Sequence, residues 1–133
     1  MSNQTLKSTV LVVEDEDSFR RVLIHRLTAA GYDVMAARNG LEALNWLNDP
    51  LHYPQLALLD ILLPVLSGLD VLHKIRSLPR PLPIIMMSHV DEPIARQAVA
   101  EGRPDAFLAK PFSMEELLAL IEQLLTSAPA RNP

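Results

Sequence analysis

The sequence contains no cysteine among its 133 residues. Disulfide bonds, thiolate catalysis and cysteine-based zinc sites are therefore excluded. Lysine and arginine together number 12 against 16 aspartates and glutamates, and no basic stripe runs along the chain. This balance argues against direct nucleic-acid binding by this chain, because contacts with phosphates need clustered cations.

Long hydrophobic runs are also missing. No apolar stretch reaches the roughly 20 residues that a membrane-spanning helix needs, and the first segment, MSNQTLKSTV, lacks the apolar core of a signal peptide. The sequence therefore predicts a soluble, cytoplasmic protein with no membrane partner. Apolar residues still make up 49% of the chain, enough for one hydrophobic core and too many for a disordered chain.

Short apolar runs alternate with segments of helical periodicity along the whole chain. Strands are predicted in TVLVV, YDVMAA, LALLD, IIMMS and AFLA, and helices over 18–31, 40–48, 67–78, 91–102 and 113–125. Continuous apolar strands that alternate with helices predict a parallel sheet with helices on both faces. Right-handed crossovers then give a doubly wound α/β fold, which binds ligands at the carboxyl ends of its strands.

The alternating pattern occupies one segment, so a single domain is predicted over residues 9–126. No internal repeat and no second domain are visible. Residues 1–8 are expected to form a flexible tail. The last residues, 127–133, are rich in alanine and proline and are expected to form a C-terminal tail or the stub of a linker.

Polar side chains gather where the predicted strands end. They are Glu14 and Asp15 after the first strand, Asp60 in the third, Ser88 in the fourth and Lys110 after the fifth. These ends share one edge of a parallel sheet, where clustered carboxylates repel one another unless a cation such as Mg²⁺ joins them. A lysine and a serine beside an aspartate suit a phosphoryl group, which a carboxylate can accept covalently. The pattern predicts an aspartyl-phosphate site with Asp60 as the nucleophile.

The segments LVVEDE, LLDILLPVLSG, IIMMS and FLAKPF resemble, in order and spacing, the receiver domain of two-component response regulators. The resemblance runs roughly from Thr9 to Leu125 and implies a five-stranded flavodoxin-like fold. It also implies a phosphorylation switch, in which Asp60 takes a phosphoryl group from a histidine kinase or a histidine phosphotransfer protein. Because the protein catalyses transfer to its own side chain, we do not expect a turnover enzyme. The face formed by the fourth helix, the fifth strand and the fifth helix would then control a downstream partner or a fused output domain.

The resemblance also implies roles for single residues. Mg²⁺, with Mn²⁺ as a possible substitute, would be held by Glu14, Asp15, Asp60 and the backbone carbonyl of Leu62. Ser88 and Lys110 would bind the phosphoryl group. A homodimer that forms on phosphorylation is a further expectation.

Four other positions match the family in a structural or switching role. Phe107 would be an aromatic switch that turns inward when Ser88 moves. Pro111 would follow a cis peptide bond, and Pro64 and Gly68 match the loop that follows the phosphoacceptor.

Two features depart from the family pattern. His89 follows Ser88 where the family usually has a small residue, so its imidazole would crowd the phosphoryl site or contact it. Leu62 and Val90 stand two residues past Asp60 and Ser88, at positions that tune the access of water to the acyl phosphate. Both are apolar, and we therefore predict that the phosphorylated form loses its phosphate slowly.

Three other classes of protein share parts of this pattern. One is a phosphohydrolase with an aspartate nucleophile. Such an enzyme usually has a second acid, the general acid, two residues further on, and Leu62 at that position in this chain counts against turnover. A flavin-binding domain of flavodoxin type would need a Ser/Thr/Gly-rich phosphate loop in place of EDEDSF. A degenerate receiver that serves as a phosphorylation-independent protein-interaction module stays open because of His89.

Overall fold

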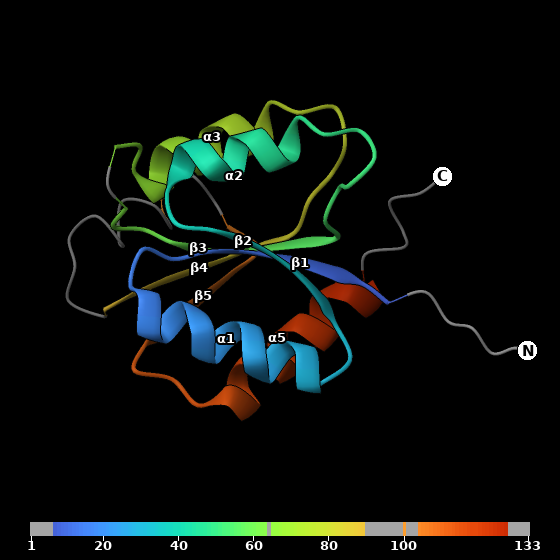
Figure 1. Ribbon diagram of the computed structural model, residues 1–133, viewed down its shortest axis with the longest axis vertical. Helices are drawn as coiled ribbons and strands as arrows, with labels where there is room; N and C mark the ends of the chain where they lie inside the picture. The colour runs from blue at the N-terminus through green and yellow to red at the C-terminus, as the bar shows by residue number, and fades with distance from the viewer. Residues whose placement is uncertain (1–6, 64, 90–99, 101–103, 128–133) are drawn as a thin grey trace, which may run out of the picture.

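The computed structural model describes residues 7–63, 65–89, 100 and 104–127 (Figure 1). Five strands form one parallel sheet in the order β2-β1-β3-β4-β5. They are β1 (Thr9–Val13), β2 (Asp33–Ala37), β3 (Leu56–Asp60), β4 (Ile84–His89) and β5 (Ala106–Lys110). The described helices are α1 (Asp17–Ala29), α2 (Gly40–Leu47), α3 (Gly68–Arg76) and α5 (Met114–Ser127). The helix predicted over 91–102 falls almost wholly outside the described residues.

The helices lie on both faces of the sheet. Figure 1 shows α2 and α3 above the sheet and α1 and α5 below it. Each face has its own core cluster, one shared with α2 and α3 and the other with α1 and α5. This strand order is that of flavodoxin-like doubly wound sheets, so the predicted fold class is confirmed.

The central strands are covered on both faces, which explains why their sequences are apolar at successive positions, without alternating polar residues. All five residues of β3 are buried. Successive apolar residues of the strand belong in turn to one core cluster and then to the other. Leu59 packs toward the cluster of α2 and α3, whereas Leu58 packs toward that of α1 and α5. A strand covered on both faces has no solvent side, and therefore needs apolar residues at every position.

Local signals define most helix ends. A capping box begins α5, because Ser113 Oγ accepts from the Glu116 N–H and the Glu116 carboxylate accepts from the Ser113 N–H, each at 3.0 Å. Ser67 caps α3 through the Asp70 N–H at 3.2 Å. Gly31, with a φ of 102°, ends the first helical segment as predicted. In contrast, Glu16 at the N-cap of α1 makes no side-chain capping bond.

The topology creates a crevice at the carboxyl ends of β1 and β3. These strands are neighbours in the sheet, but α1 and α3, which follow them, pack on opposite faces. The loops after the two strands therefore separate at this edge, which is where doubly wound sheets bind ligands.

Candidate functional site

Three carboxylates meet at this crevice. Glu14 continues from β1, where its N–H donates to the Ala37 carbonyl at 3.1 Å, and Asp60 is the last residue of β3. The exposed Asp15 joins them, and one carboxylate oxygen from each of the three residues lies within 4.8 Å of the others. Glu14 is 1% exposed and Asp60 6%. The structure thus brings together the three acids that the sequence placed at one edge.

Lys110, at the end of β5, reaches into this cluster. Its Nζ donates to Asp60 Oδ2 at 2.8 Å and to Glu14 Oε1 at 3.2 Å. The same ammonium lies 5.0 Å from the centre of the Phe19 ring, close enough for a cation–π contact. The ammonium therefore bridges two buried carboxylates while an aromatic face of α1 covers it.

The burial of these groups changes their ionisation. Burial, with the neighbouring charge of Asp60, raises the pKa of Glu14 to about 7, although Lys110 opposes the shift. For Lys110, burial alone would lower the pKa, but the hydrogen bond and charge of Asp60, together with Glu14, outweigh it and raise the pKa. The ammonium therefore stays charged, whereas Glu14 exchanges a proton near neutral pH.

The backbone after Asp60 is fixed tightly against this site. The Leu62 N–H donates to Asp60 Oδ1 at 3.0 Å, and the Gly68 N–H donates to the Ile61 carbonyl at 2.8 Å. A Cβ on Gly68 would lie 2.2 Å from the Asp60 carbonyl oxygen, so only glycine fits there. The backbone of Asp60 and Ile61 therefore excludes any side chain at position 68. Pro64 lies outside the described residues.

Ser88 supplies a hydroxyl on the neighbouring strand β4. The residue is 3% exposed, and its Oγ has no hydrogen-bond partner among the residues that the structure describes. Because buried hydroxyls are normally hydrogen-bonded, this donor suits an anion that reaches the carboxyl edge of the sheet. Val90 and the side chain of His89 lie outside the described part of the chain.

The other predicted positions sit in β5 and just after it. Phe107 is partly buried and packs against the core cluster shared with α2 and α3. The peptide bond between Lys110 and Pro111 is cis, as predicted.

The donor set fits Mg²⁺. Carboxylate oxygens are the ligands that this hard cation prefers, and three of them converge here from two adjacent strand ends. A divalent cation would also relieve the repulsion among carboxylates that a single lysine leaves uncompensated.

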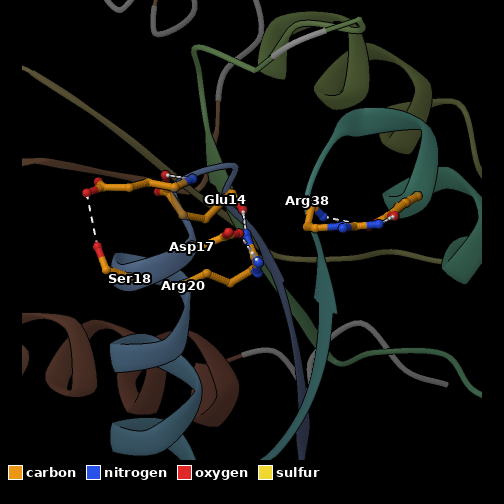
Figure 2. Close-up of polar contacts among 7 residues, drawn as sticks. Glu14, Asp17, Ser18, Arg20 and Arg38 are labelled. Carbon is orange, nitrogen blue, oxygen red and sulfur yellow. Dashed lines mark hydrogen bonds and ion pairs between the residues drawn. The ribbon is translucent and has the colours of Figure 1, made fainter.

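Sequence reasoning missed two residues beside the site: Phe19, whose ring lies over the Lys110 ammonium, and Arg20. Arg20, in the first turn of α1, donates from Nη1 to the Glu14 carbonyl at 2.9 Å and pairs through Nη2 with Asp17 (Figure 2). Its spacing of three residues from Asp17 predicts the ion pair. Nothing in the sequence predicts the bond to the Glu14 main chain, because that bond depends on how the loop turns.

Comparison with known proteins assigns the family. The family model described as the response regulator receiver domain matches residues 10–122, and the chain belongs to this family. It is 42% identical over 128 residues to the "Probable transcriptional regulator ycf27" of Pyropia yezoensis, covering 96% of this chain and 51% of that protein. It is 36% identical over 125 residues to the response regulator MprA of Mycobacterium sp. (strain KMS), covering 93% and 54%.

A solved structure agrees with this assignment. The response regulator TrrA of Thermotoga maritima, in complex with Mg²⁺ and BeF, is 31% identical with a TM-score of 0.77, covering 88% of this chain and 98% of that one. The chain spans about half the length of the curated relatives that it matches, 51% and 54% for the two above. Among the described residues, no helix is long and apolar enough to cross a membrane.

Proposed function

We propose that this receiver domain is a phosphorylation-activated switch in which Asp60 accepts a phosphoryl group from a histidine kinase or a histidine phosphotransfer protein. The observation that carries the proposal is the environment of Asp60. Its carboxylate is buried at the sheet edge, bound to the Lys110 ammonium at 2.8 Å, and grouped with two further acids. A buried carboxylate that is held in place by a cation and open to a metal suits attack on phosphorus.

Each neighbour of Asp60 has a part in the transfer. Glu14 and Asp15, with Asp60 and the Leu62 carbonyl, would hold Mg²⁺, which supplies positive charge to the phosphoryl oxygens. Lys110 offsets the remaining negative charge through its point charge. The Leu62 N–H, at 3.0 Å from Asp60 Oδ1, fixes the orientation of the carboxylate.

The phosphorylated form would differ from the free form at Ser88 and Lys110. Phosphorylation adds negative charge and three acceptor oxygens at the sheet edge, and the Ser88 hydroxyl is a buried donor without a described partner. Binding of Ser88 to the phosphoryl group favours one member of a pair of conformations. Phe107, one strand away on β5, would repack with it and alter the surface near α5 that meets an output partner.

The test is direct phosphorylation. The purified protein is treated with a small phosphodonor, with and without Mg²⁺, and its intact mass is measured beside that of Asp60→Asn. The matched control is Asp70→Asn, which removes an exposed carboxylate on α3. We expect a gain of one phosphoryl group that needs Mg²⁺, is lost in Asp60→Asn and persists in Asp70→Asn.

The opposite result would favour the degenerate receiver. If the folded protein binds Mg²⁺ and gains no mass, the chain serves as a phosphorylation-independent interaction module. His89→Ala would then show whether the imidazole after Ser88 blocks the site, because a regained mass shift would identify it as the cause.

A further inference from the structure

The Arg20 side chain contacts the acidic loop, which we define as residues 14–17, at two points. Its Nη1 donates to the Glu14 carbonyl at 2.9 Å. Its Nη2 pairs with the Asp17 carboxylate. In Figure 2 the Arg20 side chain extends from α1 toward the end of β1, with Asp17 beside it. The Arg20 side chain therefore joins the first turn of α1 to the main chain at the end of β1.

A plain surface ion pair does not account for this arrangement. Exposed pairs three residues apart on a helix contribute little, because solvent screens them. Arg20, however, has only 12% of its side chain exposed, whereas its partner Asp17 has 65%. Its other acceptor is a main-chain carbonyl, which needs a donor at a fixed position. Of the two partners, Arg20 is therefore the buried one, and its guanidinium contacts the main chain of Glu14.

The helix α1 lacks a side-chain cap at its N-terminus. Asn39, Ser67 and Ser113 cap the other described helices through their side chains, but Glu16 makes no such bond. Arg20 does not supply this cap, because a guanidinium only donates, but its side chain joins α1 to the end of β1 through the Glu14 carbonyl.

The rest of Glu14 is already fixed by other groups. Its N–H donates to the Ala37 carbonyl at 3.1 Å, and its carboxylate accepts from Lys110 at 3.2 Å. The Glu14 carbonyl is the remaining main-chain group, and it is the hinge between the end of β1 and the exposed Asp15. The bond from Arg20 restrains the backbone before Asp15, and the bond from the Glu16 N–H to Glu14 Oε2 at 3.2 Å restrains the backbone after it.

We propose that Arg20 is a positioning residue for the divalent cation: its hydrogen bond to the Glu14 carbonyl fixes the acidic loop so that Glu14 and Asp15 bind the ion together with Asp60. The inference rests on the proposed function, since it concerns the same site. The residue does not touch the ion or the phosphoryl group. It acts on the main chain between Glu14 and Asp15, the two proposed ligands. Residues that are hydrogen-bonded to metal ligands commonly orient those ligands in this way.

Charge and geometry predict opposite effects of removing this arginine. Loss of a nearby positive charge alone would strengthen the binding of a cation by the carboxylates. Loss of the bond to Glu14 would leave a row of four acids to repel one another and spread, which would weaken binding. Arginine is also specific here, because its planar guanidinium presents Nη1 and Nη2 to the Glu14 carbonyl and to Asp17 in a fixed geometry, which the single nitrogen of a lysine does not reproduce.

The experiment compares Arg20→Gln and Arg20→Lys with the same changes at Arg21. Arg21 is the adjacent, exposed arginine on α1, so it controls for charge and for helix position. Mg²⁺ alone is titrated into each purified protein by calorimetry, and thermal unfolding is recorded without metal. We expect Mg²⁺ to bind about 10- to 100-fold more weakly in both Arg20 variants, with the Arg21 variants close to wild type. Phosphorylation by a small donor should recover in the Arg20 variants at saturating Mg²⁺.

Several results would overturn the inference. Unchanged or tighter Mg²⁺ binding in Arg20→Gln would leave only an effect of charge, and wild-type binding in Arg20→Lys would show that the fork is not needed. If Arg20→Gln unfolds too readily to titrate, the milder Arg20→Lys decides the question. The proposed function fails separately: a wild-type protein that binds Mg²⁺ but gains no phosphoryl group contradicts the switch and leaves the Mg²⁺ comparison intact.

Discussion

The Lys110 ammonium lies 2.8 Å from Asp60 and 3.2 Å from Glu14, so one cation joins the proposed phosphoacceptor to a proposed metal ligand. Lys110 and a metal ion therefore compete for the same two carboxylates. We predict that Lys110→Met strengthens Mg²⁺ binding, because a competing positive charge is gone, and slows phosphorylation by a small donor about 100-fold.

Calorimetry and timed mass spectra would measure these two effects. Lys74→Met, at an exposed position on α3, is the control and should change neither. Parallel losses of Mg²⁺ binding and phosphorylation in Lys110→Met would show that the lysine organises the site rather than competing for it.

The raised pKa of Glu14 makes metal binding depend on pH near neutrality. The pKa of about 7 arises mainly from burial, so near pH 6 most of the metal-free protein carries a proton on this acid. Mg²⁺ needs the carboxylate and must displace that proton. Its affinity should therefore rise about tenfold between pH 6 and pH 8 and level off above that.

Calorimetry in buffers of different ionisation enthalpy would count the protons that Mg²⁺ releases. The release should approach one proton below pH 7 and vanish above pH 8. Glu14→Gln should bind Mg²⁺ weakly with a flat pH profile over this range. A wild-type profile that is equally flat would contradict the assignment of the shift to Glu14.

The sequence allowed the site to be predicted because topology does most of the assembly. Once the strands are parallel, Asp60 and Lys110 must emerge at the same edge, whatever the details of the loops. The burial of Glu14 could not be foreseen, since four acids in a row normally indicate a solvated loop. The contact between Arg20 and the Glu14 carbonyl was equally hidden. Both depend on the path of a few backbone bonds after β1, which hydrophobic periodicity does not describe.

Ser88→Ala should separate stability from function. The Ser88 hydroxyl is buried with no partner among the described residues, and an unpaired buried hydroxyl costs about 1–3 kcal/mol. We therefore expect the unphosphorylated variant to be as stable as wild type or more stable by about 1 kcal/mol in urea unfolding. Phosphorylation should be slower, because the phosphoryl group loses a donor.

The control for this variant is Ser77→Ala at the end of α3. Its hydroxyl donates to the Lys74 carbonyl at 2.7 Å on the surface, so its loss should cost a little stability and leave phosphorylation unchanged. A large destabilisation by Ser88→Ala would mean that the hydroxyl already has a partner in the free protein.

Val65 carries backbone strain in the loop after the phosphoacceptor. Its φ is 71°, in the left-handed region, although it is β-branched, and its side chain is 84% exposed. The left-handed conformation costs about 1–2 kcal/mol for such a residue. Val65→Gly removes that cost. The greater freedom of glycine in the unfolded chain opposes this gain by about 0.5–1 kcal/mol.

We thus expect a net stabilisation of up to about 1 kcal/mol in urea unfolding. Val65→Ala is the matched variant, since it trims the side chain but keeps the strained backbone, and it should change stability little. Equal effects of the two substitutions would assign the change to the exposed side chain instead of the strain.

Leu62 should govern how long the phosphorylated form lasts. It stands two residues after Asp60, at the position that the family resemblance links to the access of water, and its N–H donates to the Asp60 carboxylate. A polar side chain at this position can hold and orient an attacking water, which leucine cannot. We expect the wild-type phosphoryl group to last far longer than seconds, and Leu62→Gln to lose it at least severalfold faster.

Timed intact masses after removal of the phosphodonor would give both lifetimes. Leu41→Gln, at another exposed leucine on α2, controls for a general effect of replacing surface leucine and should match wild type. A wild-type lifetime of seconds would contradict the prediction outright. A long lifetime that Leu62→Gln fails to shorten would mean that Leu62 does not govern water access, which would turn attention to Val90, the other apolar residue at a family position for water access.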